Sequence, residues 1–322
     1  MKHILVRGAI AALTLFCAVA QAQTFPSRPI HIIVPFATGG GTDALTRIVA
    51  QQMSEQMKVP VVIENKPGAG GTLGAAIAAR APADGYILHT YTMSSPMMSA
   101  LYKTLSFDPV GDFAPVGLIG TSPFVLIMNN KVPAQTLPEL LALAKAKPGS
   151  LSYGSAGNGT VSHIGMELFT SMAGVDIQHV PYKGNGPAMA DLLGGHLTLL
   201  LDTVVSATPH VKANSVRALA VTSAGRSPLL PGLPTVNESG PKGYEMTVWY
   251  GFVAPKGTPL PVLQKLNEEL NKALASPALR QRYAVLGAEP TQITVEDFGK
   301  LMTAEEKKWG AVIKKANIPQ IQ

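Results

Sequence analysis

The chain has 322 residues, of which 46% are hydrophobic and 14% charged, and a formal net charge of +6. This composition is typical of a globular chain that builds a core, as one large or two ordinary domains. The charge is mild and no Lys/Arg cluster interleaves with aromatic residues, which argues against a nucleic-acid-binding protein.

Residues 1–22 have the pattern of a secretory signal peptide. Lys2 and Arg7 give a positive start, and an apolar run over 10–19 is too short for a comfortable membrane span. Residues 20–22 have the small-x-small pattern of a cleavage site. We therefore expect a mature chain that is soluble and lies outside the cytoplasm, with an uncleaved anchor or a buried N-terminal helix as the alternative.

The sequence contains one cysteine, Cys17, which lies inside this segment. The bulky Phe16 precedes it where a lipoprotein signal has a small residue, so we do not predict a lipid anchor. Cleavage would remove the thiol, and with it disulfides, Cys-ligated zinc and a Cys nucleophile. The histidines form no close ligand pair, and we predict neither a metal nor a cofactor.

Strands and helices alternate through the first part of the chain. Continuous apolar runs predict buried strands, and apolar residues three and four apart predict helices. The order βαβαβ predicts a parallel sheet with right-handed crossovers. The predicted strands cover 30–34, 59–63 and 86–91, and the predicted helices cover 43–57 and 72–80.

The middle of the chain repeats this alternation, and the C-terminal part is mostly helical. The predicted strands of these parts cover 151–153, 177–180, 197–201 and 217–222. The predicted helices cover 137–147, 161–172, 187–193, 259–275, 277–286 and 295–316.

Two long apolar stretches, 114–128 and 246–255, are predicted to cross between two lobes. The expected fold is α/β, a two-lobed arrangement in which each lobe has a mainly parallel sheet flanked by helices. A single doubly wound sheet is the alternative. The first lobe would be discontinuous, and the predicted domains are a signal peptide (1–22), lobe 1 (23–122 plus 247–322) and lobe 2 (123–246).

Each predicted lobe has a glycine-rich loop between a strand and a helix, at 39–43 and 154–160. Free amides at a helix start and the helix dipole attract anions, and glycine lets the backbone approach a ligand. Alternatively, these loops are tight turns capped by Asp43 and Thr160. Their pairing across two lobes favours a ligand with anionic groups between the lobes.

Nucleotide sites fit these loops poorly. The second loop has the glycine spacing of a P-loop but Thr160 in place of the required lysine. Residues 68–74 resemble a dinucleotide fingerprint, but the third glycine comes one place late.

A secreted α/β serine hydrolase using Ser155 is the alternative function. Ser155 lies in a sequence that resembles a nucleophile elbow, although Tyr153 replaces the first glycine of that motif. His163 and Asp202 could complete a triad on paper.

Hydroxyl and amide groups suited to a carboxylate gather near the strand-to-helix turns. Asp202, after the strand at 197–201, could accept from an ammonium or hydroxyl group of the ligand, or act as a helix N-cap. Lys183 is either a ligand contact or a solvated loop residue. The hydroxyl and amide residues are Thr42, Thr90, Ser94, Ser95, Ser155, Asn158 and Thr160.

With these features, the chain resembles the Bug family, the solute receptors of tripartite tricarboxylate transporters. The matching stretches follow one another along the mature chain. They are VPFATGGGTD (34–43), ENKPGAGG (64–71), DGY (84–86), YGSAGNGT (153–160), His163, VPYKG (180–184), DLLGG (191–195), RALAV (217–221), Pro234-Thr235, WYGFVAP (249–255) and Trp309. Gly41 departs from the family pattern, which often has Pro or Ala there.

The resemblance implies a Venus-flytrap receptor, not an enzyme, for a small carboxylate such as a di- or tricarboxylate, an acidic amino acid or an aromatic acid. The second-lobe loop would hold one carboxylate and the first-lobe loop would close on it. His89 and residues 93–97 would line a variable wall. The candidate ligand-binding residues are Thr38, Gly40, Thr42, Asp43, Thr90, Ser94, Ser155, Ala156, Gly159, Thr160, His163, Tyr182 and Asp202.

The resemblance also implies the partners. We expect a monomer that hands its ligand to the membrane subunits of a tripartite tricarboxylate-type transporter or acts in a sensor, without nucleic acid.

Overall fold

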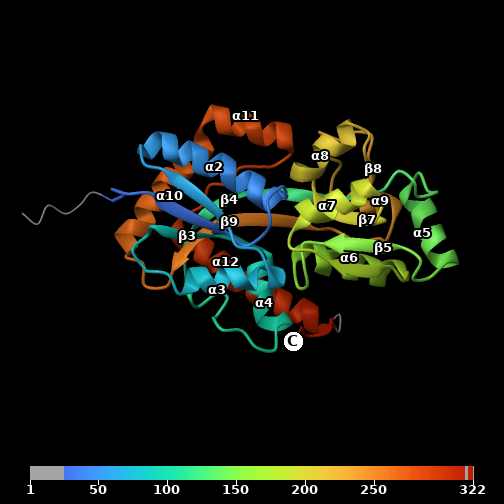
Figure 1. The fold of residues 1–322 in the computed structure, drawn as a ribbon, viewed down its shortest axis with the longest axis horizontal. Helices are drawn as coiled ribbons and strands as arrows, with labels where there is room; N and C mark the ends of the chain where they lie inside the picture. The colour runs from blue at the N-terminus through green and yellow to red at the C-terminus, as the bar shows by residue number, and fades with distance from the viewer. Residues whose placement is uncertain (1–24, 316–317, 322) are drawn as a thin grey trace, which may run out of the picture.

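The computed structural model describes residues 25–315 and 318–321. The predicted signal peptide and Cys17 lie outside these residues. Within the described ranges, no helix combines the length and apolar character needed to cross a membrane. Figure 1 shows two halves joined by long strands, with helices on both sides of the strands.

The first half is built from a strand–helix alternation close to the predicted one. Strands β1 and β2 pair in parallel, as do β1 and β3. The elements are β1 (Ile30–Val34), α2 (Gly41–Met57), β2 (Val61–Asn65), η1 (Ala69–Gly71), α3 (Thr72–Ala79), β3 (Ile87–Thr92) and α4 (Ser94–Leu101).

The second half repeats this pattern, with β5 parallel to both β6 and β7. Each of its parallel strands leads into a helix at its carboxyl end. The elements are α5 (Leu137–Ala146), β5 (Ser152–Ser155), α6 (Val161–Ala173), β6 (Gln178–Pro181), α7 (Asn185–Gly194), β7 (Leu199–Thr203), α8 (Val204–Lys212), β8 (Arg217–Val221) and α9 (Val236–Ser239).

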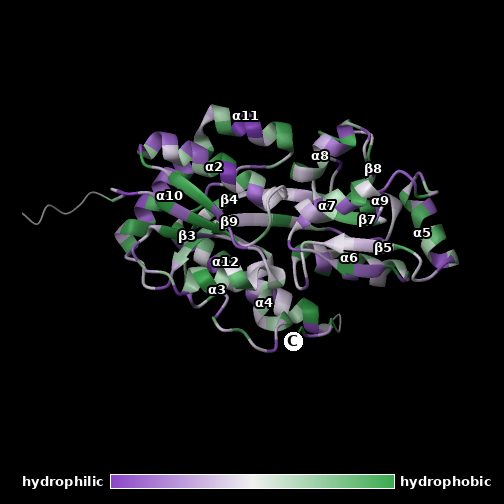
Figure 2. Ribbon diagram, viewed as in Figure 1, coloured by the Kyte–Doolittle hydropathy of each residue, from purple (hydrophilic) through white to green (hydrophobic). Residues whose placement is uncertain are grey.

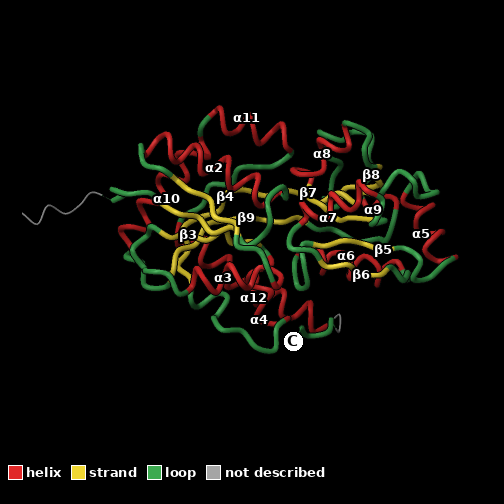
Figure 3. The backbone as a smooth tube through the Cα atoms, viewed as in Figure 1, coloured by secondary structure: helices red, strands yellow, loops and turns green. Residues whose placement is uncertain are grey.

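Two strands, β4 (Phe113–Met128) and β9 (Thr247–Pro255), connect the halves. They pair with each other antiparallel, β9 also pairs with β3, and the end of β4 pairs with β7 and β8. The strand order β2-β1-β3-β9-β4-β7-β5-β6 is therefore continuous, with β8 attached to β4. Figure 3 shows these strands as a central band between helices. The lobe boundaries at 122/123 and 246/247 stay a prediction.

The C-terminal helices α10 (Leu260–Ala275), α11 (Pro277–Leu286) and α12 (Val295–Lys315) return to the first half. Helix α10 packs on α2 and β4, and α12 packs on α4 and β4. Figure 2 shows both hydrophobic and hydrophilic stretches on these outer helices, as expected where one face is buried. This packing fixes the position of the first half relative to the connecting strands.

Three helices differ from the predicted pattern. Helix α4 contains Pro96 and opens with two serines, which reads as a loop. Helix α8 starts directly after β7 with Val204 and Val205, which favour strand locally, and it contains Pro209. Helix α9 has only four residues. The unpredicted α4 and α8 both begin beside the candidate site.

Candidate functional site

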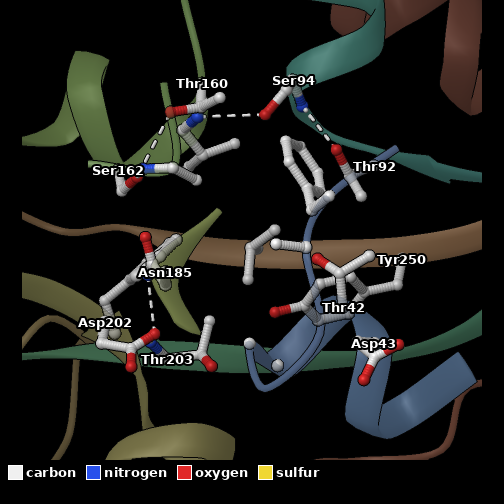
Figure 4. Close-up of a pocket in the computed structure, with 18 residues that line it drawn as sticks. Thr42, Asp43, Thr92, Ser94, Thr160, Ser162, Asn185, Asp202, Thr203 and Tyr250 are labelled. Carbon is white, nitrogen blue, oxygen red and sulfur yellow. Dashed lines mark hydrogen bonds between the residues drawn. The ribbon is translucent and has the colours of Figure 1, made fainter. Parts of the chain in front are cut away.

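A cavity of about 50 Å³ lies where the two halves meet. The first half, the second half and the connecting strands all contribute to its wall (Figure 4). The lining residues are Phe36, Ala37, Gly40, Gly41, Thr42, Asp43, Thr92, Ser94, Phe124, Ala156, Thr160, Val161, Ser162, Asn185, Asp202, Thr203, Val248 and Tyr250.

Five helices, α2, α4, α6, α7 and α8, begin at this cavity, and none is capped by the side chain of its own N-cap residue. Other side chains accept from two of the first amides: Thr92 Oγ1 from Ser94, and Ser94 Oγ from Val161. The first amides of a helix have no intrahelical partner and carry partial positive charge. Thr160 stands at the N-cap position of α6, but its hydroxyl donates to the carbonyl of Gly157, at 2.7 Å, instead of capping the helix. The predicted side-chain cap by Thr160 is therefore wrong, and the wall offers main-chain donors to an anion.

Asp43 lies in the first turn of α2 and orders the loop before it. Its carboxylate accepts from Arg47 Nε at 3.0 Å, from Asn65 Nδ2 at 2.9 Å and from the Gly39 amide at 3.3 Å. The Asp43 carboxylate thus has both a cationic partner and a structural role, in addition to its place on the wall.

Ser155 is fully buried and lies outside the cavity wall. Its Oγ lies 2.6 Å from Nε2 of His179 and accepts from the Gly157 amide at 3.1 Å. Burial, and then the neighbouring His163, lower the pKa of His179 to about 4. Through its bonds to His179 and to the Gly157 amide, Ser155 holds the glycine loop in place from within the protein.

His163 stacks on His179, with ring centroids 4.2 Å apart. Its Nδ1 accepts from the Gly159 amide at 3.2 Å, so Gly159 also serves the internal order of the loop. The triad considered for a hydrolase is not assembled: Ser155 pairs with His179 rather than His163, and Asp202 bonds to Asn185.

The sequence-predicted ligand residues divide into two groups. Gly40, Thr42, Asp43, Ser94, Ala156, Thr160 and Asp202 line the cavity, whereas Thr38, Thr90, Ser155, Gly159, His163 and Tyr182 do not. Two further side chains of the second group bond elsewhere: Thr90 contacts Thr46, and Tyr182 donates to Asp191. His89 is buried in β3, next to β1 in the sheet, and bonds to the Ile33 carbonyl, so its expected place on the wall is wrong.

Sequence reasoning missed several polar wall residues, above all Asn185, Thr203 and Tyr250. Asn185 is the first residue of α7 and follows Gly184, the last residue of the VPYKG stretch. Thr203 follows Asp202 at the end of β7. Both positions could have been found from the strand-to-helix rule. Tyr250 lies within connecting strand β9, where no local signal marks a site.

The halves contact each other around the cavity, so the arrangement is closed. The Ala37 amide donates to the Lys183 carbonyl at 2.8 Å, and the Val161 amide donates to Ser94 Oγ at 3.0 Å. A Cβ added at Gly41 would lie 2.3 Å from Thr203 Oγ1. Glycine at position 41, the departure noted in the sequence, therefore permits this close approach.

Residues 45–318 match the family described as Tripartite tricarboxylate transporter family receptor. The chain belongs to this family. A relative from Agrobacterium vitis, the UPF0065 protein in the TAR-I ttuE-ttuC' intergenic region, is 42% identical over 86% of this chain and 80% of its own length.

Solved structures agree with this membership. The periplasmic binding protein BugD is 37% identical, with a TM-score of 0.89 over 92% of this receptor and 100% of BugD. The R. palustris protein Rpa4515, solved with adipate, is 36% identical, with a TM-score of 0.88 over 92% of this receptor and 100% of its own chain. The two-lobed binding-protein fold predicted from the sequence is confirmed. Members of this family and these neighbours are solute-binding receptors rather than enzymes.

Proposed function

We propose that this receptor captures a small carboxylate in the cavity between its halves. The observation that carries the proposal is the convergence of five helix starts on one closed cavity. Such starts bind anions without needing a cationic side chain. The adipate in the related Rpa4515 structure supports the same class of ligand.

Two loops would share the carboxylate. The loop at 155–160 offers Ala156 and Thr160 on the cavity wall, and the loop at 38–43 offers Gly40, Thr42 and Asp43 from the other half. Thr38, Ser155, Gly159, His163 and Tyr182 would act by holding these loops in place. Thr90 would support α2 through Thr46.

The setting we propose is the periplasm, after removal of residues 1–22. The receptor would work as a monomer and deliver its ligand to tripartite tricarboxylate-type membrane subunits or to a sensor. Its capture step would be a hinge closure, because the ligand touches both halves only when they are closed. Ligand binding energy would then set the open–closed equilibrium.

A carboxylate panel in a thermal unfolding assay tests the proposal. A ligand present at about 100 times its Kd is expected to add about 2.7 kcal/mol to the free energy of unfolding. The methyl ester or amide of each binding acid, which lacks the carboxylate, serves as the control. If no carboxylate raises the Tm, or if the blocked acids raise it equally, the proposed function is wrong.

Replacement of Tyr102 by phenylalanine is expected to weaken ligand binding roughly fivefold. Tyr102 Oη lies 3.1 Å from the carbonyl of Ala69 and 3.0 Å from that of Asn158, which belong to opposite halves. Burial raises the pKa of Tyr102 to about 12, so the hydroxyl keeps its proton and donates. Loss of one such hydrogen bond costs about 1 kcal/mol.

Titration calorimetry of the Tyr102→Phe variant with a ligand from the panel measures this effect. An unchanged Kd would mean that the hydroxyl does not stabilise the closed form. The Tyr86→Phe variant, which removes a hydroxyl bonded to Ser27 within the first half, is a matched control with unchanged affinity expected.

A further inference from the structure

Three polar atoms on the cavity wall have no hydrogen-bond partner among the described residues. They are Asp202 Oδ2, Asn185 Oδ1 and Tyr250 Oη. The three side chains are at most 8% exposed. An unpaired buried polar atom costs free energy, and two of these atoms can only accept a hydrogen bond when Asp202 is ionised. Tyr250 Oη carries a proton and can donate to one of these acceptors, so at least one acceptor at this place still needs a donor.

The charges on the wall also favour a hydrogen-bond donor on the ligand near Asp202. Asp43 and Asp202 are its acidic residues, and it contains no lysine, arginine or histidine. Asp43 is matched by Arg47 at 2.9 Å, whereas the Asp202 carboxylate bonds only to uncharged groups, Asn185 Nδ2 at 2.6 Å and the Thr203 amide at 2.8 Å. Burial raises the pKa of Asp202, against the opposing effect of its hydrogen bonds, because no cation on the wall stabilises its charge. A second ligand carboxylate at this end would repel the ionised form, whereas a ligand ammonium group would stabilise it.

The opposite end of the cavity is different. Figure 4 shows Ser94, Thr160 and Ser162 across the cavity from Asp202. Ser94 Oγ accepts from the Val161 amide, which leaves its hydroxyl proton free to donate. The starts of α4 and α6 meet there, and their first amides bond to Thr92 Oγ1 and Ser94 Oγ. The Ser94 hydroxyl and the positive ends of the two helix dipoles therefore suit this end to the ligand carboxylate. At the Asp202 end, the amide of Thr203, which directly precedes α8, already donates to Asp202.

We propose that the ligand is a small carboxylic acid whose other end carries a hydrogen-bond donor, an ammonium group in preference to a hydroxyl or amide, directed at Asp202. This inference rests on the proposed function and narrows its ligand class. It disfavours acids that place a second ionised carboxylate at that end.

A matched series of acids that differ only in the terminal group tests it by calorimetry. The four-carbon series is 4-aminobutanoate, 4-hydroxybutanoate, succinamate, succinate and butanoate, and the corresponding six-carbon series covers a longer ligand. In the length that fits, we expect the amino acid to bind at least about tenfold more tightly than the dicarboxylate. If the dicarboxylate binds as tightly or more tightly, this inference fails and the proposed function stands. If no acid of either series binds while another carboxylate of the panel does, this inference fails and the proposed function stands.

The Asp202→Asn variant separates recognition from folding. It is expected to weaken the amino acid roughly ten- to a hundredfold and to leave the dicarboxylate unchanged or tighter, because it removes the negative charge and replaces the unpaired Oδ2 acceptor by an NH2 donor. Asp191→Asn, the same change at an α7 residue outside the cavity that bonds to Tyr182, should leave both affinities within about twofold. Equal weakening of both ligands by Asp202→Asn, with an unchanged Tm, would contradict the proposal.

Discussion

Replacement of Gly186 by alanine is expected to weaken ligand binding roughly ten- to a hundredfold without destabilising the unliganded protein. A Cβ at this position would lie 2.1 Å from the carbonyl oxygen of Thr38, which belongs to the other half. The obstacle is backbone, so closure would need a shift of the loop, and overpacking of this kind costs about 1–3 kcal/mol. The open form would not contain the clash.

Local geometry makes this change selective for the closed form. Gly186 lies in the first turn of α7 and does not have a positive φ, so alanine fits its backbone. Alanine is also the better helix former. At Gly41, the obstacle is the Thr203 side chain, which can rotate, and we expect a smaller effect from Gly41→Ala.

Calorimetry of Gly186→Ala with a panel carboxylate, together with urea unfolding without ligand, measures both parts. Gly310→Ala on α12 is the control, because a Cβ there meets nothing within 4 Å. It should leave the affinity unchanged. Wild-type affinity in Gly186→Ala would mean that the contact between Gly186 and Thr38 is not required for binding.

Acidification is expected to destabilise the protein by about 3 kcal/mol through His89 alone. His89 is 1% exposed, and its burial lowers its pKa from 6.5 to about 4, against the opposing effect of its bond to the Ile33 carbonyl. The unfolded state therefore binds more protons between these two values. The contribution to stability is complete above about pH 6.5 and is lost as the pH falls towards about 4.

Urea unfolding of wild type and His89→Asn at about pH 7 and about pH 4.5 tests this, because asparagine cannot titrate but can keep a donor near Ile33. The difference in unfolding free energy between the two pH values should be smaller in the variant by about 2–3 kcal/mol. His163 and His179 titrate in both proteins and so cancel in the comparison. Equal pH dependence in both proteins would show that His89 is not buried as a neutral base.

Most helices and strands, and the chemistry of the two glycine-rich loops, can be predicted from the sequence. A segment with a clear hydrophobic period can be predicted from its own residues. This holds for the long helices α2 and α10 and for the connecting strands β4 and β9. Short helices that start with serines, prolines or β-branched residues, such as α4 and α8, were missed. Their helical state depends on packing against neighbours rather than on propensity.

Which polar residues face the cavity depends on packing between elements that are far apart in the chain. Ser155 is the last residue of β5 and Asp202 the last but one of β7, and either could have faced a ligand on sequence alone. Packing against His179 turns Ser155 inwards, while closure of the halves leaves Asp202 on the wall beside Tyr250 from a distant strand. Contacts between residues far apart in the chain have no local signature. The glycines of the 34–43 stretch could therefore be predicted from the sequence as part of a site. The groups of the other half that they contact could not be predicted.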